Sequence, residues 1–345
     1  MAEAVTDTST IASWEGDDVT VTQIEAALTE LRRNEQRAAV RTSVLTLVAV
    51  VSDRGQADAA LDVVYHLGAR HPSRTIVVVV DDDADASSGI DANASVHVVE
   101  RQGTAICYEN VVLRVSGPAR HHLDSVVEPF TLPDLPVVLW MPSRLPATGD
   151  PLLDAADRLV VDSRAVPEGG DVLTRIVALS RRLYVTDLSW IRLAPWRTLL
   201  AGLFEGGVNR PFLSGVYEVQ VAGNRGPRHL LGGWLMQSLN LHRDAVSLTP
   251  AEHVSIRLSA AIDGRRGEFV VERAGAERII ESCIDIDGGP CVRQTLRMRR
   301  QWPALSLAGA LTRVGDDVTY RGALAGALEL AGERPPSSVT APAVS

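Results

Sequence analysis

The first half of the chain alternates between continuous apolar runs and segments whose apolar residues recur at helical spacing. Leu45–Val51 and Thr75–Val80 are almost unbroken apolar runs, as expected for strands that are covered on both faces. Between them, Gln56–Ala69 places apolar residues on one face of a helix. A strand, a helix and a second strand within about 40 residues form a right-handed crossover unit with a parallel sheet. We therefore predict an α/β domain with a mostly parallel, Rossmann-like sheet.

Weaker patterns extend this domain on both sides. An N-terminal helix is predicted over 22–40, and Thr22 with Glu25 forms a capping box at its start. Further strands are predicted near 96–100, 106–115, 137–140 and 158–161. Short helices are predicted at 118–127 and 151–157, and a longer one at 172–183.

The second half changes character, because short alternating runs replace the continuous ones. Between Val254 and Met298 these runs are separated by hairpin signals at Asp263-Gly264, Ala274-Gly275 and Asp287-Gly288-Gly289. Helical signals precede them at 195–204 and 228–241. We predict an α+β domain with an antiparallel sheet. The whole chain is then a flexible tail at 1–19, the α/β domain at 20–183, the α+β domain at 184–334 and a second flexible tail at 335–345.

Composition excludes several kinds of chemistry. All 34 basic side chains are arginine. Without lysine there is no Schiff base to pyridoxal phosphate, no phosphate-loop lysine of a nucleotide hydrolase and no kinase lysine. The net charge of −9 argues against nucleic acid or an anionic membrane as the main partner. With three cysteines, no apolar stretch of about 18 residues and no signal peptide, we expect a cytoplasmic protein.

Short motifs of catalysis are missing from the sequence. No glycine fingerprint of a dinucleotide site follows Val51 or Val80, no serine lies in a nucleophile-elbow pattern, and no histidine pair has zinc-protease spacing. We therefore expect no enzyme activity, no catalytic residue, no cofactor and no metal. One alternative stays open at Asp81, Asp82 and Asp83, which could hold a divalent cation on a nucleotide sugar or form a solvated acidic loop.

A glycine-rich turn between a predicted strand and a predicted helix is a candidate anion-binding site. Backbone amides at the start of that helix, together with arginine side chains, could hold a phosphate. The candidate residues are Gly223, Arg225, Gly226 and Arg228. The alternative is an ordinary connecting turn.

Two cysteines flank a predicted hairpin turn. Cys283 and Cys291 could form a reversible disulfide across it, or they could be two separately packed thiols.

Tryptophan and arginine gather in one short segment, at 187–197. Both residue types are enriched at binding hot spots. They could equally pack at the predicted domain junction, which falls in the same segment. The candidate partner-binding residues are Trp190, Arg192, Trp196 and Arg197, with Arg74 and Trp140 from earlier segments.

Five motifs in order carry a family resemblance. They are HPSRTIVVV at His71–Val79, LPDLPVVLWMP at Leu132–Pro142, DRLVVDS at Asp157–Ser163, DLSWIRLAPWR at Asp187–Arg197 and HLLGGWLMQSLN at His229–Asn240. Over about residues 20–300 the chain resembles the OpcA family of glucose-6-phosphate dehydrogenase assembly proteins. The resemblance implies a non-enzymatic partner that promotes assembly or activation of the dehydrogenase that opens the oxidative pentose phosphate pathway.

Three hypotheses follow. The leading one is an assembly factor and allosteric activator of glucose-6-phosphate dehydrogenase, which acts by protein–protein binding. The second is a sugar-phosphate sensor that uses Arg225, Arg228 and the glycine turn. The third is a divergent, metal-dependent glycosyltransferase-like enzyme that uses Asp81 and Asp83.

Overall fold

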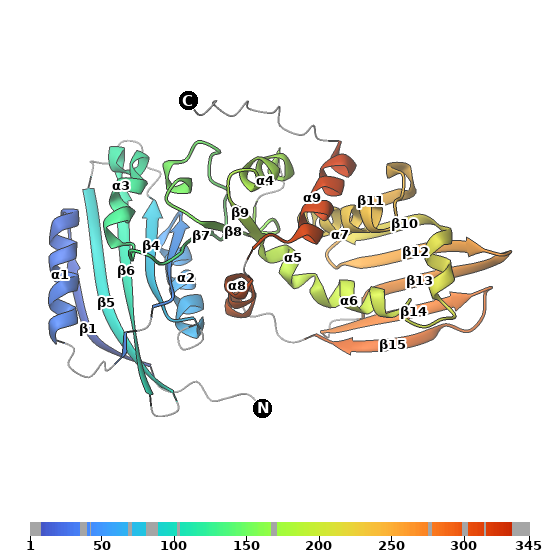
Figure 1. Cartoon of the computed structure of the whole chain (residues 1–345), viewed down its shortest axis with the longest axis horizontal. Coiled ribbons are helices and arrows are strands. Elements are labelled where there is room, and N and C mark those ends of the chain that lie inside the picture. The colour runs from blue at the N-terminus through green and yellow to red at the C-terminus, as the bar shows by residue number, and fades with distance from the viewer. Residues whose placement is uncertain are drawn as a thin grey trace. The chain divides into compact units, whose positions relative to one another are not determined.

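The structure of the chain falls into two compact units (Figure 1). It is a computed structural model that describes residues 8–34, 40–41, 43–67, 71–80, 89–101, 104–166, 171–274, 278–298, 303–313 and 315–332. Unit 1 comprises the described residues within 1–162, 183–186 and 303–314. Unit 2 comprises those within 163–182, 187–302 and 315–345. The predicted domain limits in the sequence stay predictions, and each unit is described by itself below.

Unit 1 is built on a sheet that has nine strands in the described part of the chain, in the order β1-β5-β6-β4-β3-β7-β8-β9, with β2 beside β6. The strands are β1 (Thr8–Gly16), β2 (Val40–Arg41), β3 (Leu45–Val51), β4 (Ser73–Val80), β5 (Gly89–Arg101), β6 (Thr104–Ser116), β7 (Val137–Met141), β8 (Arg158–Val161) and β9 (Tyr184–Asp187). From β6 to β8 all neighbours are parallel, and β5 and β1 add antiparallel pairs at one edge. The mostly parallel sheet predicted from the apolar runs is therefore confirmed.

The predicted crossover unit is β3–α2–β4. Every residue of β3 and β4 is buried, and the two strands pair in parallel from Leu45 opposite Ser73 to Val51 opposite Val79. This explains why their sequences are almost continuously apolar rather than alternating.

Helices pack on this sheet at several places. They are α1 (Val21–Asn34), α2 (Arg54–Leu67), α3 (Leu123–Val127) and α8 (Pro303–Thr312), with short 3-10 turns η2 (Gly117–His121), η3 (Glu128–Phe130) and η4 (Pro151–Leu153). α1 contacts β5, α2 contacts β3 and β4, and α8 contacts α2. The capping box of α1 lies two residues before the predicted one. Thr20 N donates to Gln23 Oε1 at 2.8 Å, and Gln23 N donates to Thr20 Oγ1 at 3.4 Å.

Unit 2 contains a sheet with six strands in the described residues, in the order β11-β10-β12-β13-β14-β15. The strands are β10 (Val216–Gly223), β11 (Val246–Pro250), β12 (Ser255–Ile262), β13 (Arg265–Ala274), β14 (Ile279–Ile286) and β15 (Val292–Arg297). Only β10 and β11 pair in parallel among these strands. The predicted antiparallel sheet is confirmed as a mostly antiparallel one. Two of its hairpin turns also match the prediction, since Asp263-Gly264 and Asp287-Gly288 have positive φ values.

The helices of unit 2 are α4 (Val172–Ser180), α5 (Leu188–Arg192), α6 (Ala194–Gly202), α7 (Arg225–Ser238) and α9 (Val318–Ala331), with 3-10 turns η5 (Arg210–Gly215) and η6 (Arg243–Ala245). α7 contacts β10 and β11, and α6 contacts β13 and β14. α7 packs closely on α9, and Gly233 of α7 faces Gly326 of α9. A Cβ added at Gly326 would lie 2.6 Å from the carbonyl oxygen of Gly233.

Candidate functional site

The turn between β10 and α7 needs glycine at its first position. Gly223 has φ +146°, a backbone conformation that residues with a side chain rarely adopt. Asn224 follows as the extended N-cap residue, and its side chain makes no capping hydrogen bond to α7. The guanidinium of Arg228 donates from Nη1 to the carbonyl oxygen of Gly223 at 3.0 Å. This arginine, one of the predicted anion-binding residues, therefore fixes the turn itself.

The first turn of α7 lies directly against the residues that follow β8. A Cβ at Gly226 would come within 2.6 Å of Ser163 Oγ and 2.8 Å of its carbonyl oxygen, so only glycine fits there. The same segment is tied to the start of α5. Ser163 N donates to Asp187 Oδ1 at 3.1 Å, and Arg164 N donates to Ser189 Oγ at 3.0 Å.

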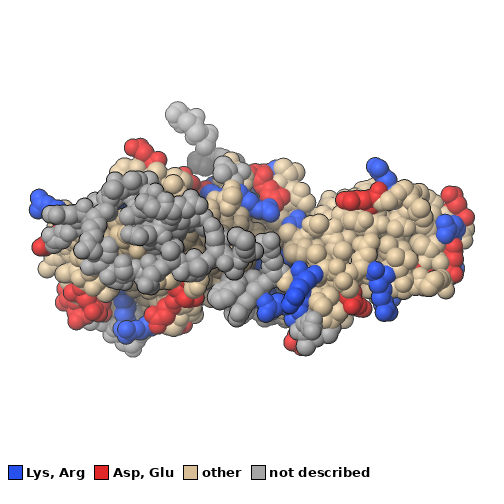
Figure 2. Space-filling view, turned by 90° about the horizontal axis from the view of Figure 1, so that it is seen from below, with Lys and Arg blue, Asp and Glu red and all other residues tan. Residues whose placement is uncertain are grey.

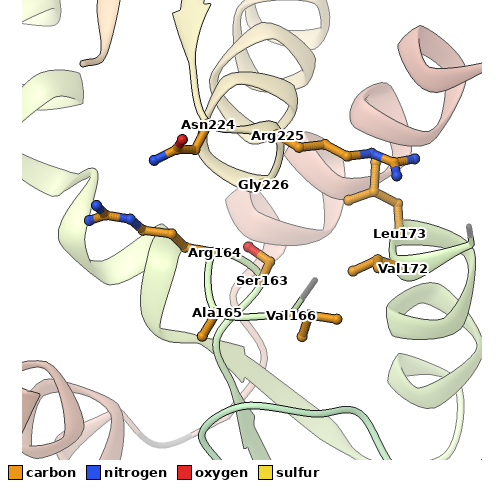
Figure 3. A pocket seen from close by; sticks show the side chains of 9 residues that line it. All are labelled: Ser163, Arg164, Ala165, Val166, Val172, Leu173, Asn224, Arg225 and Gly226. Carbon is orange, nitrogen blue, oxygen red and sulfur yellow. The ribbon is translucent and has the colours of Figure 1, made fainter. Parts of the chain in front are cut away.

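These contacts form the walls of a pocket of about 280 Å³ (Figure 3). It is lined by Ser163, Arg164, Ala165, Val166, Val172, Leu173, Asn224, Arg225 and Gly226. Among the described residues, the lining carries two guanidinium groups and no carboxylate. They include the first residues of two helices, α4 at Val172 and α7 at Arg225. The pocket thus combines positively charged side chains with the positive ends of two helix dipoles.

A buried hydroxyl group lies in the wall of this pocket. Ser163 is only 5% exposed, and its Oγ has no hydrogen-bond partner in the described part of the chain. Figure 3 shows this side chain pointing from its loop towards the first turn of α7. A buried polar group without a partner costs about 1–3 kcal/mol, so it is normally retained only where something satisfies it.

The structure sorts the predicted anion-binding residues into two groups. Arg225 and Gly226 line the pocket, whereas Gly223 and Arg228 form the turn that positions them. Ser163 and Arg164 were not predicted from the sequence as site residues. The signal that could have found them is their position directly after a strand of a parallel sheet, where open α/β sheets often bind ligands.

The segment rich in tryptophan and arginine is an internal part of unit 2. Trp190 is 2% exposed, and its Nε1 donates to Asp317 Oδ2 at 3.0 Å. The guanidinium of Arg197 lies 3.5 Å from the ring centroid of Trp190 and donates to its carbonyl oxygen. Trp196 is also buried, and Arg192 is half-buried and donates to Ser189 Oγ at 3.2 Å. Trp190 and Trp196 are therefore packing residues, and Arg192 and Arg197 remain partly accessible.

Arg74 and Trp140 lie in the core of unit 1. Arg74 is 9% exposed, and its guanidinium binds the carboxylate of Glu109, which also binds Arg32 at 2.8 Å. Burial alone would raise the pKa of Glu109, but the hydrogen bonds and charges of the two arginines hold that pKa below its usual value. Trp140, on β7, is 3% exposed. Both residues therefore have a place in the fold that needs no partner protein, and their predicted contact role stays a prediction.

The two candidate redox cysteines are joined in the structure. Cys283 on β14 forms a disulfide with Cys291, which precedes β15, with the two Cα atoms 5.5 Å apart. The bond spans the predicted hairpin turn. Of the two alternatives, a disulfide across the turn or two separately packed thiols, the structure has the disulfide. A regulatory role for it stays a prediction.

Other predictions of site chemistry are tested only in part. Asp81, Asp82 and Asp83 lie outside the described residues. Within the described residues, no group of three or more potential ligands could hold a metal ion. None of the helices that the structure describes is long and apolar enough to cross a membrane. On the face shown in Figure 2, the described acidic and arginine side chains are interspersed.

Comparison with known proteins gives matches along most of the chain. Residues 64–178 match the model of a glucose-6-phosphate dehydrogenase subunit N-terminal domain, and residues 183–324 match the model of the corresponding C-terminal domain. Both models belong to the OpcA family of dehydrogenase assembly proteins.

Three cyanobacterial relatives carry the provisional name OxPP cycle protein OpcA. The protein of Synechocystis sp. is 27% identical over 183 residues, which cover 50% of this chain and 38% of the relative. Those of Synechococcus elongatus and Nostoc punctiforme are also 27% identical, over 40% and 49% of this chain and over 33% and 38% of their own lengths. The matched part thus spans less than half the length of these relatives. With both domain models matched in order, the chain belongs to the OpcA family of glucose-6-phosphate dehydrogenase assembly proteins.

Proposed function

We propose that this protein is a non-enzymatic assembly factor and allosteric activator of glucose-6-phosphate dehydrogenase, and that it acts by protein–protein binding in the oxidative pentose phosphate pathway. The observation that carries the proposal is the match to both domain models, in order, over residues 64–178 and 183–324. The partner itself comes from the name of the family.

The mechanism that fits a binding protein is a shift of population. A protein that binds the active oligomer of an enzyme more tightly than the inactive one increases the share of the active oligomer. The shift cannot exceed the difference between the two binding free energies. The activator therefore needs no group that touches the dehydrogenase substrate.

The burial of the predicted contact residues supports a choice among them. Arg192 and Arg197 are half-buried, so a carboxylate of a partner can reach them, whereas Trp190 and Trp196 are buried. We assign the tryptophans a positioning role, in which they hold α5 and α6 in place. Arg192 is the better probe of the two arginines, because Arg197 stacks on Trp190 and contributes to packing.

The proposal is tested with the purified dehydrogenase of the same organism. Size-exclusion chromatography with light scattering measures the mass of the dehydrogenase with and without this protein, and steady-state kinetics measure its apparent affinity for substrate. We expect a complex of higher mass and a change in the kinetics. The absence of both would refute the proposed function.

A matched pair of charge reversals then tests the contact surface. Arg192→Glu should weaken the complex by about tenfold or more, since a hot-spot contact contributes about 2 kcal/mol. Arg243→Glu makes the same change of charge at an exposed position of η6, outside α5, and should leave binding unchanged. Equal effects of both variants would remove α5 from the contact surface, and circular dichroism confirms that each variant is folded.

A further inference from the structure

We infer that the pocket between the first turn of α7 and the segment that follows β8 binds the phosphate group of a small phosphate monoester. The inference concerns unit 2 alone and does not depend on the proposed function. It begins from the four sequence-predicted residues but is carried by features that only the structure shows.

The first feature is the uncapped start of α7. A helix presents unsatisfied N–H groups at its first turn together with the positive end of its dipole. The side chain of Asn224, the N-cap residue, does not satisfy these groups, and Pro227 has no N–H. The backbone of Arg225 and Gly226 therefore faces the pocket as the anion-binding part of a fourteen-residue helix.

The second feature is the buried hydroxyl of Ser163. It lies in the pocket wall with no partner in the described residues, beside the position where Gly226 lacks a Cβ. A hydroxyl can donate to a phosphate oxygen, and that bond would satisfy a group that the protein leaves unmet. The glycine and the serine together make a cradle that a side chain at 226 would fill.

The third feature is the charge of the walls. Arg164 and Arg225 line the pocket from two different elements, and the lining residues that the structure describes include no carboxylate. Arginine binds phosphate with a planar fork of donors, which makes it better suited than lysine to this role.

The size of the pocket selects the class of ligand. Its volume of about 280 Å³ lies just below the usual range of small-molecule sites, about 300–1,000 Å³. This is more room than a bare phosphate needs and too little for a dinucleotide. The remaining walls are mixed, with apolar side chains from Ala165, Val166, Val172 and Leu173 and the amide of Asn224. A phosphate monoester of a sugar fits both the charge and the volume.

Isothermal titration calorimetry of the purified full chain tests the inference with three probes. Glucose 6-phosphate should bind with a stoichiometry of one, more tightly than inorganic phosphate, and glucose should not bind. The affinity should fall as salt is added, because charge contributes to it. Equal affinity for inorganic phosphate would overturn the assignment to a monoester, and no binding of either phosphate would overturn the site.

Three variants then locate the binding. Ser163→Ala removes only the hydroxyl, and we expect affinity to fall by about tenfold, the effect of one hydrogen bond to a charged group, with thermal stability kept or slightly raised. Arg164→Ala should weaken binding at least as much. Arg243→Ala, which removes an exposed arginine outside the pocket, is the matched control and should bind as the wild type does. Wild-type affinity in both pocket variants would refute the inference, even if the chain binds phosphate elsewhere.

Discussion

Gly233 lies where α7 crosses α9, and the substitution Gly233→Ala tests whether this crossing holds unit 2 together. A Cβ at this position would overlap the backbone of Ala323 and Ala327 on α9. Backbone atoms cannot rotate away as the end of a flexible side chain can, so the two helices would have to separate. Overpacking of this kind costs about 3 kcal/mol, and the better helix propensity of alanine returns about 1 kcal/mol. We therefore expect a net loss of about 2 kcal/mol.

The matched control lies on the partner helix. Gly322 of α9 has nothing within 4 Å of an added Cβ, so Gly322→Ala gains the helix propensity without a clash. It should stabilise the protein by about 0.5–1 kcal/mol. The same substitution is thus expected to lower the free energy of unfolding at Gly233 and to raise it at Gly322.

Urea denaturation followed by far-ultraviolet circular dichroism measures both effects. The midpoint should move down for Gly233→Ala and up for Gly322→Ala, with unchanged slopes. Two results would refute the reasoning. Either Gly233→Ala is as stable as the wild type, so that the helices are not in the close contact described, or both variants lose stability alike, so that glycine is needed in these helices for another reason.

Three further predictions concern other parts of the fold. Glu109→Gln leaves two arginines around a neutral amide and should cost about 3 kcal/mol at pH 7. Because the pKa of Glu109 is lowered in the folded state, its charge contributes fully above about pH 4.5, and urea curves of the two proteins should converge as the pH falls below that value. Trp190→Phe removes the indole donor to Asp317, and a stability loss of about 1–3 kcal/mol is expected in the same assay. Reduction of the disulfide between Cys283 and Cys291 should lower stability by about 2 kcal/mol and speed hydrogen exchange in β15, and both changes should be absent in Cys283→Ser.

Much of unit 1 could be predicted because its signals are local. The runs that became β3 and β4 are apolar on every residue, and the helix between them shows a single apolar face, so strand, helix and parallel pairing follow from the sequence. β1, at Thr8–Gly16, was not found, since it lies at the sheet edge within a segment whose polar composition suggested a tail. α8 lies between two segments of unit 2 in the chain, 187–302 and 315–345, but belongs to unit 1, where Arg158 Nη2 donates to the carbonyl oxygen of Ala310 at 2.8 Å. No local sequence pattern indicates that a helix near the C-terminal end packs in the unit formed by the first half of the chain.

The candidate site also has one part that could be predicted from local sequence and one part that could not. The glycine turn and the helix start at Arg225 can be predicted from a short stretch of sequence. Ser163 and Arg164 lie more than 60 positions earlier, and only the contact between Gly226 and Ser163 brings the two segments together. For the tryptophans, the sequence pattern was found but its structural role was ambiguous. A cluster of Trp and Arg is typical both of binding surfaces and of cores in which a guanidinium stacks on an indole. The Arg197 guanidinium lies 3.5 Å from the Trp190 ring centroid, so this pair packs in the second way, and the predicted contact role of the arginines stays a prediction.

The start of α5 and the pocket wall at Ser163 and Arg164 are connected by hydrogen bonds in unit 2. Asp187 accepts from Ser189 N at 2.8 Å as the N-cap of α5, and the same oxygen accepts from Ser163 N in the pocket wall. Ser189 in turn accepts from Arg164 N with its hydroxyl. The start of α5, which leads into Trp190, and the wall that carries Ser163 therefore share their acceptors, so neither can shift without changing the hydrogen bonds of the other. If a partner engages α5 and a phosphate engages the pocket, each would alter the affinity for the other by the same factor, because a coupling free energy is reciprocal.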